Sequence, residues 1–311
     1  MTAASIRAAT AADIPTCAEI WRESINDYTG RLNQHPIPDD LGRIIRLHQH
    51  LFATDPSLFV VAERDGRLVA FAAALRRERL WFLSMCFVRP AEQGRGLGRR
   101  LLAAILPGPG DDAILATATD SAQPISNALY SRYGIVPRLP LLSVSGYLTN
   151  PDVLPGLPAG MAAVPFETIA AGPPGGAGHL ELTTAVDALD RELLGVAHPQ
   201  DHRFLRTEGR HGYLYRDAIG ATQGYGYAWE TGRIGPVAVR DAALAGPVLG
   251  HLLRAVQSRG AQAVWVPGAA GAVVELLLAA GLRFEDFPIL LGWNRPFADF
   301  ERYLPISPGL L

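Results

Sequence analysis

The chain contains no lysine, so all 28 of its lysine-plus-arginine residues are arginines. The absence of lysine excludes a phosphate-binding P-loop and any Schiff base on the protein, because both need a lysine amine. Cysteine is also scarce. Only Cys17 and Cys86 are present, too few for a disulfide framework and typical of a reducing compartment. We therefore expect a cytoplasmic protein.

No run of eighteen or more apolar residues occurs, and residues 1–10 lack the basic and then apolar stretches of a signal peptide. We expect neither a membrane span nor binding to a membrane surface. The formal net charge is only −2, so no basic surface for nucleic acid is predicted. With 311 residues, 49% of them hydrophobic, the chain is long enough for two domains, each with its own core.

Hydrophobic periodicity and turn residues predict alternating strands and helices in the first half. Thr10, three residues before Asp13, is typical of a helix start, and the pair Asp65-Gly66 is typical of a hairpin turn. The expected strands are 5–8, 58–62, 68–75, 80–88, 113–118 and 139–145. One helix is expected to begin near Asp13, and three others are expected at 41–51, 99–106 and 125–133.

The second half repeats this order after a segment rich in proline and glycine. Its expected strands are 224–229, 234–239, 263–266 and 287–293, and its expected helices are 244–256 and 273–280. We predict a first domain at 1–149, a linker at 150–160 and a second domain at 161–311. Each is expected to be an α/β domain with a mixed, mostly antiparallel sheet flanked by helices.

A glycine-rich turn between strand 80–88 and the helix that follows carries the first functional signal. Glycines and a helix N-terminus together present backbone N–H groups to an anion, which suits a pyrophosphate. A dinucleotide-binding pattern fails here, because its third glycine would stand at Arg99. The pattern that fits is Gln-x-x-Gly-x-Gly, formed by Gln93, Gly96 and Gly98.

A second motif lies at 126–135, on a predicted helix in which Tyr130 precedes Gly134 by four residues. With both motifs in this order, the chain resembles the GNAT superfamily of acyl-CoA N-acyltransferases over residues 5–146. The resemblance implies that the glycine turn holds the CoA pyrophosphate. It also implies that backbone groups near Phe87 and Val88 hold pantetheine and polarise the thioester carbonyl.

In that family the matching tyrosine, here Tyr130, protonates the departing thiolate, and the amine attacks the thioester directly. The resemblance thus implies acetyl-CoA as acyl donor, a small-molecule amine as acceptor, Tyr130 as the catalytic residue and no metal. The residues expected to bind the acyl-CoA are Phe87, Val88, Gln93, Gly94, Arg95, Gly96, Leu97, Gly98, Arg99 and Asn127.

The general base is left open by the sequence. Many relatives carry a carboxylate on the strand where Ser84 and Met85 stand here. Alternative bases are Glu78, His48 and Asp39. Two other functions also stay open: a non-catalytic acyl-CoA-binding or sensor module, and a transferase for longer acyl-CoA or for peptide N-termini.

The second domain lacks both motifs. Bulky residues replace Gln93, Gly96, Gly98 and the tyrosine, namely Leu244, Pro247, Leu249 and Leu277. Proline removes a backbone donor that an anion site would need. We expect this domain to be structural or to wall the acceptor pocket. Because of the internal repeat, one chain is expected to resemble a dimer. The protein itself is expected to be a monomer or a homodimer.

Three other groups have plainer interpretations. Cys86 is expected to be a core residue, because no histidine is placed beside it. His198 and His202, with Asp201 between them, are a possible metal pair, but no third ligand is evident and a polar loop or helix start is expected. The arginines at 76, 77 and 79 are expected to form a solvated hairpin tip, or else to steer an anionic acceptor or the CoA 3′-phosphate.

Overall fold

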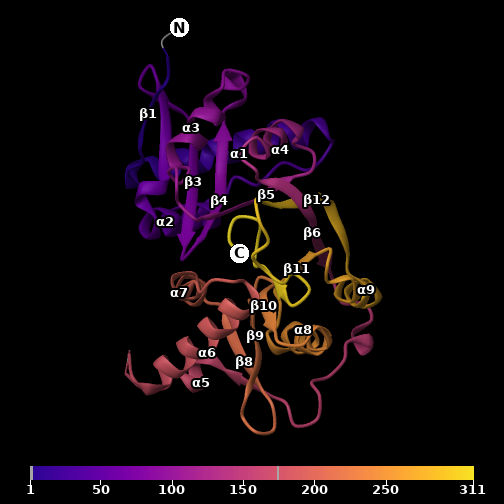
Figure 1. Ribbon diagram of the computed structural model, residues 1–311. Helices are drawn as coiled ribbons and strands as arrows, with labels where there is room; N and C mark the ends of the chain where they lie inside the picture. Colours follow the sequence, from indigo (N-terminus) through magenta and orange to yellow (C-terminus); the bar gives the residue numbers. More distant parts are fainter. Residues whose placement is uncertain (1–2, 174) are drawn as a thin grey trace. The chain divides into compact units, whose positions relative to one another are not determined.

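The computed structural model describes residues 3–173 and 175–311 and divides into two compact units, one ending at Thr117 and one running from Ala118 to Leu311 (Figure 1). In each unit helices flank a mostly antiparallel sheet, so the predicted fold class is confirmed. Within these described residues, no helix combines the length and the apolar character needed to cross a lipid bilayer.

The first unit contains five strands in the order β1-β2-β3-β4-β5, all antiparallel except for the β4–β5 pair. The end of β5, beyond Thr117, belongs to the second unit. The elements are β1 (Ser5–Ala8), η1 (Ala11–Asp13), α1 (Ile14–Arg31), α2 (Gly42–Thr54), η2 (Pro56–Leu58), β2 (Phe59–Arg64), β3 (Arg67–Arg77), β4 (Leu80–Val88), η3 (Pro90–Glu92), α3 (Leu97–Ile105) and β5 (Ile114–Asp120).

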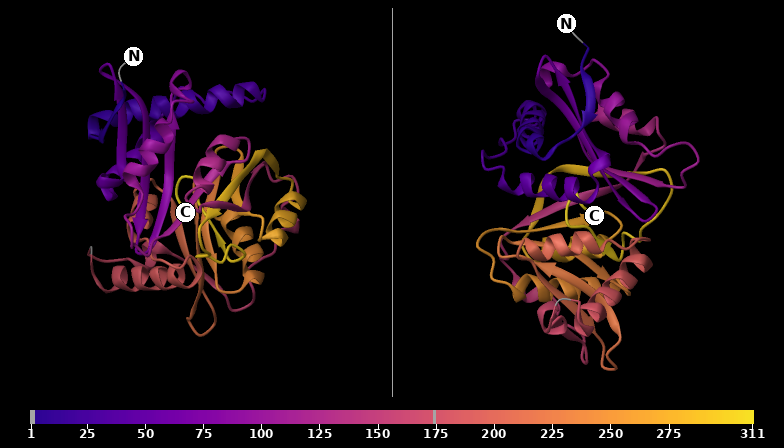
Figure 2. Two further views of the ribbon diagram at one scale, coloured as in Figure 1. Left: turned by 45° about the horizontal axis from the view of Figure 1, so that its top comes forward. Right: turned by 90° about the vertical axis from the view of Figure 1, so that its left-hand side faces the viewer.

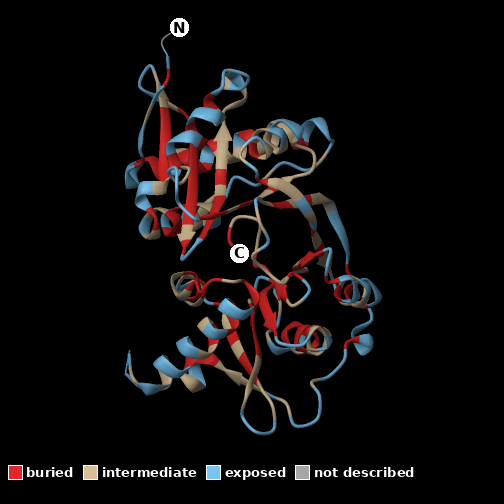
Figure 3. Cartoon of the chain, in the orientation of Figure 1, coloured by how far each residue is buried: buried red, intermediate tan, exposed pale blue. Residues whose placement is uncertain are grey.

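Helices cover both faces of this sheet. Residues 69–75 of β3 are buried without interruption, although successive side chains of a strand point to opposite faces (Figure 3). Helices α1 and α2 lie on one face and α3 on the other (Figure 2). Buried residues of α3, such as Leu97 and Leu101, recur at helical spacing and contribute its apolar face.

The predicted start of the first helix is confirmed. The Asp13 carboxylate accepts hydrogen bonds from the Thr10 backbone N–H at 2.7 Å and from the Thr10 hydroxyl at 2.8 Å. Arg7 also donates to Asp13, at 2.8 Å. This guanidinium is the main reason why the pKa of Asp13 is lowered to about 2.

In the described part of the second unit, seven strands follow the order β12-β6-β11-β10-β9-β8-β7, and an eighth, short strand, β13, pairs with β10. The elements are α4 (Pro124–Ser131), β6 (Val136–Gly146), η4 (Pro151–Val153), β7 (Ala162–Pro165), α5 (Phe166–Ile169), α6 (Ala177–Leu193), α7 (Pro199–Thr207), β8 (His211–Arg216), β9 (Thr222–Ala228), β10 (Arg233–Val239), η5 (Ala242–Leu244), α8 (Ala245–Ala255), β11 (Gln262–Pro267), α9 (Gly271–Ala279), β12 (Arg283–Trp293) and β13 (Tyr303–Leu304).

Strand β6 decides where the compact units divide. It lies between β11 and β12, and Val144 is opposite both Val264 and Phe284. These ladders join residues of the first half of the sequence to the sheet of the second. This pairing places β6 in the second compact unit, which begins after Thr117. That the two repeats form separate domains at 1–149 and 161–311 stays a prediction.

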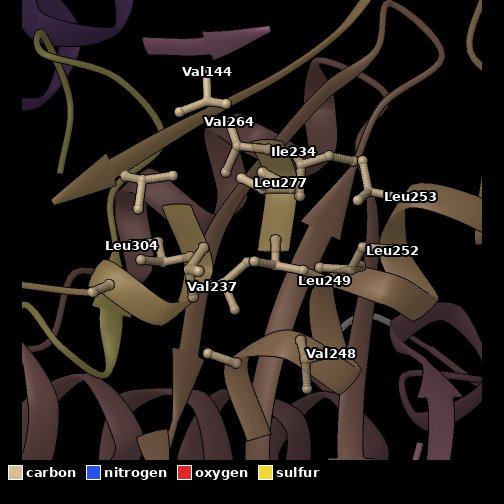
Figure 4. Close-up of a cluster of buried hydrophobic side chains, with 14 of the residues drawn as sticks. Val144, Ile234, Val237, Val248, Leu249, Leu252, Leu253, Val264, Leu277 and Leu304 are labelled. Atoms are coloured by element: carbon tan, nitrogen blue, oxygen red, sulfur yellow. The ribbon is translucent and has the colours of Figure 1, made fainter. Parts of the chain in front are cut away.

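The core of the second unit forms where α8 and α9 pack on the sheet (Figure 4). Gly226 of β9 permits this packing, because a Cβ there would lie 2.6 Å from Leu252 Cδ1 of α8. Side chains alternate along a strand, so Tyr225 and Tyr227 point to the opposite face of β9. There they contact Asp190 of α6 and His202 of α7.

The internal repeat is visible in the strand register. The alignment that matches Val88 with Val239 also matches Leu83 with Ile234. The parallel β4–β5 ladder ends at the pair Leu83–Thr117, and the parallel β10–β11 ladder ends at Ile234–Val264. Just beyond, both β4 and β10 contain a one-residue bulge in their antiparallel ladder. The two repeats therefore share their backbone construction.

Candidate functional site

The glycine turn places an open, uncapped helix N-terminus after β4. Gly94 and Gly96 both have φ of 75°, a left-handed conformation that favours glycine. Gly96 is the N-cap residue of α3, and no side chain in the described part of the chain caps this helix. A Cβ built on either glycine would have nothing within 4 Å. The free N–H groups and the helix dipole thus border open space, which suits an anion.

Side chains of the first unit hold this turn in place. The Gln93 side-chain amide donates to the Val88 carbonyl at 3.0 Å, which closes the turn onto β4. Glu92 forms ion pairs with Arg64 of β2 and with Arg95. In contrast, Arg99 is exposed, and no ion pair or hydrogen bond of its side chain is found within 3–173 and 175–311. Its guanidinium remains available to a phosphate.

The end of β4 is the part of this strand that is predicted to bind pantetheine. Its pairing with β3 continues to Val88, whereas its pairing with β5 ends at Leu83. Arg89 N–H donates to the Val69 carbonyl. Because hydrogen-bonded pairs alternate along an antiparallel ladder, the main chain of Phe87 faces β3 and that of Val88 faces away from it. Val88 is therefore the better placed of the two predicted residues to bind an extended ligand.

Helix α1 lies against this strand end. The Ser24 hydroxyl donates to the Val88 carbonyl at 3.0 Å, so that carbonyl accepts from both Ser24 and Gln93. The group of Val88 that remains for a thioester oxygen is its N–H. A backbone N–H is the type of donor that stabilises a developing oxyanion.

The second predicted motif lies in the second unit, on α4. The Asn127 side-chain amide donates to the carbonyls of Asp120 and Gln123, at 3.0 and 2.9 Å, and so ties α4 to the end of β5. Tyr130 is nearly buried, and its carbonyl accepts from the Ile135 N–H after a left-handed Gly134. The glycine in this motif thus ends the helix that carries Tyr130.

A cavity of about 620 Å³ opens in the first unit beside α1 and the loop that follows it. Its lining residues are Arg22, Glu23, Asn26, Pro36, Ile37, Pro38, Asp39 and Pro90. Asn26 accepts a hydrogen bond from the Ile37 backbone at 2.8 Å and so fixes the loop over the cavity. Pro90 lies two residues after Val88, the last residue of β4, which places the cavity next to the predicted thioester site.

Two carboxylates line this cavity, each paired with an arginine. Asp39 pairs with Arg22, and its side chain is fully exposed. Glu23 pairs with Arg89. Asp39 is one of the bases predicted from the sequence. Glu23 is not, because nothing in the sequence distinguishes it from the other polar residues of an amphipathic helix. The side chain of Glu23 is 42% exposed, so both carboxylates are accessible from solvent.

The remaining candidate bases are less suitable. His48 is 0% exposed and packs against Phe71 and Phe59, with ring centroids 5.2 and 6.1 Å away. Burial lowers its pKa to about 3. The proposal that His48 is the base is therefore wrong, since it has no path to a substrate. Glu78 has φ of 47° in the turn between β3 and β4, outside the residues that line the cavity.

The predicted solvated arginine cluster is partly wrong. Arg77 is only 3% exposed and pairs with the buried Asp55 at 2.7 Å. Arg76 pairs with Asp111 at 2.9 Å. These two arginines stabilise the end of the β3–β4 hairpin, because each holds a carboxylate from another segment of the first unit.

In the described part of the second repeat, the equivalent strand edge is covered. Val237 and Ala238 of β10, which correspond to Cys86 and Phe87, pair with Leu304 and Tyr303 of β13. Residues near the C-terminal end thus occupy the edge that is left open on β4. Leu249 and Leu277, which replace a motif glycine and the tyrosine, are fully buried in the core.

The comparisons with known proteins agree with this geometry. The sequence profile of the acetyltransferase (GNAT) family matches residues 18–135. The match lies in the N-terminal part of the chain and covers less than half of its 311 residues. No match is found among curated proteins.

Solved structures share the fold over almost the whole chain. A candidate acetyltransferase from Pyrococcus horikoshii has a TM-score of 0.73 at 15% identity, and the match covers 100% of this chain and 97% of that one. A GCN5-related N-acetyltransferase from Sphaerobacter thermophilus gives 0.59 at 20% identity, with 96% and 98% covered. A tandem GNAT protein from the clavulanic acid biosynthesis pathway gives 0.55 at 16% identity, with 94% and 99% covered.

Proposed function

We propose that this chain is an acetyl-CoA-dependent N-acetyltransferase with a single site in its N-terminal repeat. The observation that carries the proposal is the contrast between two equivalent strand edges. The edge of β4 is left open beyond Leu83, next to the uncapped N-terminus of α3. The matching edge of β10 is occupied by β13. Only the first repeat can therefore add an extended ligand alongside its strand.

In the proposed reaction the nitrogen of a neutral amine attacks the thioester carbonyl carbon, and the C–S bond then breaks. The Val88 N–H stabilises the oxyanion of the tetrahedral intermediate. Tyr130 gives its phenolic proton to the departing thiolate, and a base takes the proton lost by the amine. The pyrophosphate binds at the N–H groups of the turn at 93–98, and Arg99 neutralises a further phosphate. This mechanism needs no metal.

We propose that the cavity beside α1 takes the acceptor, a small-molecule amine. Amines are cationic at neutral pH, and Glu23 and Asp39 supply the opposite charge at the cavity wall. One of them, directly or through a water molecule, is then the base that removes the proton. Pro36, Ile37, Pro38 and Pro90 form the apolar part of the wall and would contact the carbon skeleton.

Calorimetric titration with acetyl-CoA, followed by measurement of free CoA thiol with a panel of amines, tests the proposal. We expect one site per chain and thiol release that depends on an amine. Binding without turnover of any amine would instead support an acyl-CoA sensor. Faster turnover with longer acyl chains or with peptide N-termini would change the substrate class. No binding would overturn the proposal, and two sites would show that the second repeat also binds acyl-CoA.

A further inference from the structure

A cluster of ionisable side chains is buried in the second unit, on the face of β9 opposite to the α8–α9 core. Asp190 of α6, His198 just before α7 and His202 of α7 are 0%, 1% and 5% exposed. One ligand-type atom of each lies within 4.8 Å of those of the other two. The sequence shows the histidine pair but no third partner. The fold supplies that partner from α6, eight residues before His198 in the sequence.

The Nε2 atoms of both histidines lie close to the same carboxylate oxygen of Asp190. Asp190 Oδ2 lies 2.9 Å from His202 Nε2 and 3.3 Å from His198 Nε2. Ligand atoms bound to a tetrahedral zinc ion at about 2.0–2.1 Å lie roughly 3.3 Å from one another. The two separations are thus close to those of ligands that share one ion.

The outer atoms of the same three residues are held by other partners. His202 Nδ1 lies 2.9 Å from the Tyr227 hydroxyl, and His198 Nδ1 lies 3.4 Å from Asp201 Oδ2. Asp190 Oδ1 accepts a hydrogen bond from the Tyr225 hydroxyl at 2.6 Å. Metal-binding histidines and carboxylates are usually oriented by such outer hydrogen bonds, often from a carboxylate to the far nitrogen of the imidazole.

We propose that Asp190, His198 and His202 form a binding site for a divalent transition-metal ion, with zinc as the best-suited cation. Two imidazoles and one carboxylate are ligands that zinc accepts readily. The buried carboxylates of Asp190 and Asp201 together match the charge of a divalent ion.

The site is enclosed, so its role is structural and distinct from acyl transfer. Catalytic zinc sites keep a coordination position open to substrate, whereas these ligands are almost entirely buried. The ion would join α6 to α7 beneath β9. It would also act close to β13, because the Tyr303 hydroxyl lies 3.4 Å from His198 Nε2.

The test uses the full chain without an affinity tag, first stripped of metal by a chelator and then titrated with Zn²⁺. We expect one equivalent bound per chain, a rise in unfolding temperature, and no comparable effect of Mg²⁺. Co²⁺ in place of Zn²⁺ should give the visible absorption of a cobalt ion bound by protein ligands. A hydrogen-bonded network alone would not give that spectrum.

Variants locate the site. His198→Gln or His202→Gln should weaken Zn²⁺ binding at least a hundredfold. His211→Gln, another histidine of the second unit, should leave it unchanged. Asp201→Ala should keep one equivalent but weaken binding about 10–100-fold, as expected for loss of an outer hydrogen bond. Folded wild-type chain that binds no Zn²⁺, or binding unaltered in both histidine variants, would overturn the proposal. The wild-type titration alone decides the question if a variant does not fold.

Discussion

Leu304 of β13 pairs with Val237 of β10 in an antiparallel bridge, at the strand edge that corresponds to the open end of β4. Its side chain is 1% exposed and belongs to the core of the second unit. A segment near the C-terminus thus completes the sheet of the repeat that lost its glycine turn. The same bridge stabilises the second unit and closes the edge that an acyl-CoA would need.

Replacement of this leucine should destabilise the second unit without creating a second acyl-CoA site. Leu304→Ala removes buried apolar contacts and should lower the free energy of unfolding by about 2–4 kcal/mol, measured by urea denaturation. Leu180→Ala on α6 is the control, since that leucine is 67% exposed, and should change it by less than about 0.5 kcal/mol. Acetyl-CoA stoichiometry above one per chain in the Leu304 variant would show that the second repeat can bind acyl-CoA without the glycine turn.

The glycine turn can be tested with a glycine pair matched in conformation. Gly96 and Gly66 both have φ of 75° and open space beside them, but Gly66 lies in the β2–β3 hairpin. Alanine at either position should cost about 1–2 kcal/mol of stability through left-handed strain. Only Gly96→Ala should also weaken acetyl-CoA binding, by tenfold or more in calorimetry. Equal affinities in the two variants would argue against a phosphate at this turn.

Loss of the Tyr130 hydroxyl should slow the chemical step more than it affects binding. We expect Tyr130→Phe to lower kcat by about a hundredfold, because the thiolate then leaves without a proton donor. The dissociation constant of acetyl-CoA should change little. Tyr133→Phe, on the same motif, is the control and should keep kcat. A Tyr130→Phe enzyme with normal kcat would remove this residue from the mechanism.

The two cavity carboxylates should act on the amine and not on acetyl-CoA. Glu23→Gln and Asp39→Asn should each raise KM for the amine about tenfold, since a cationic substrate loses one opposite charge, and the variant of the base should also lower kcat. Glu19→Gln, one turn earlier on α1, lies outside the cavity lining and should be neutral. If all three variants share wild-type kinetics, the acceptor binds elsewhere.

The buried His48 predicts a pH dependence of stability. Its pKa is about 3 in the folded chain and about 6.5 in the unfolded chain. The unfolded state therefore binds more protons between these values, and stability falls as pH drops below 6.5, by up to about 1.4 kcal/mol per pH unit. Stability curves for the wild type and His48→Leu should converge at low pH or cross there. Parallel curves from pH 7 to 4 would show that His48 does not titrate as described.

Much of the candidate site is proposed from sequence signals that are local. Gln93, Gly96 and Gly98 follow one strand within a few residues, and a left-handed backbone at a turn is a requirement that glycine satisfies by itself. The order of strands and helices in both halves is also local information, carried by the period of the apolar residues. The internal repeat can be predicted for the same reason, because two segments with the same order of apolar periods are expected to form the same order of strands and helices.

Contacts between distant residues were decided by the tertiary structure alone. The pairing of β6 with β11 and β12 depends on which sheet edge is free after folding, and it places β6 in the compact unit that begins after Thr117. Asp190 joins His198 and His202 only because α6 and α7 pack against β9. His48 looked like a base on a polar helix, and packing buried it between aromatic rings. In each case the missing information was a neighbour far away in sequence, which periodicity does not encode.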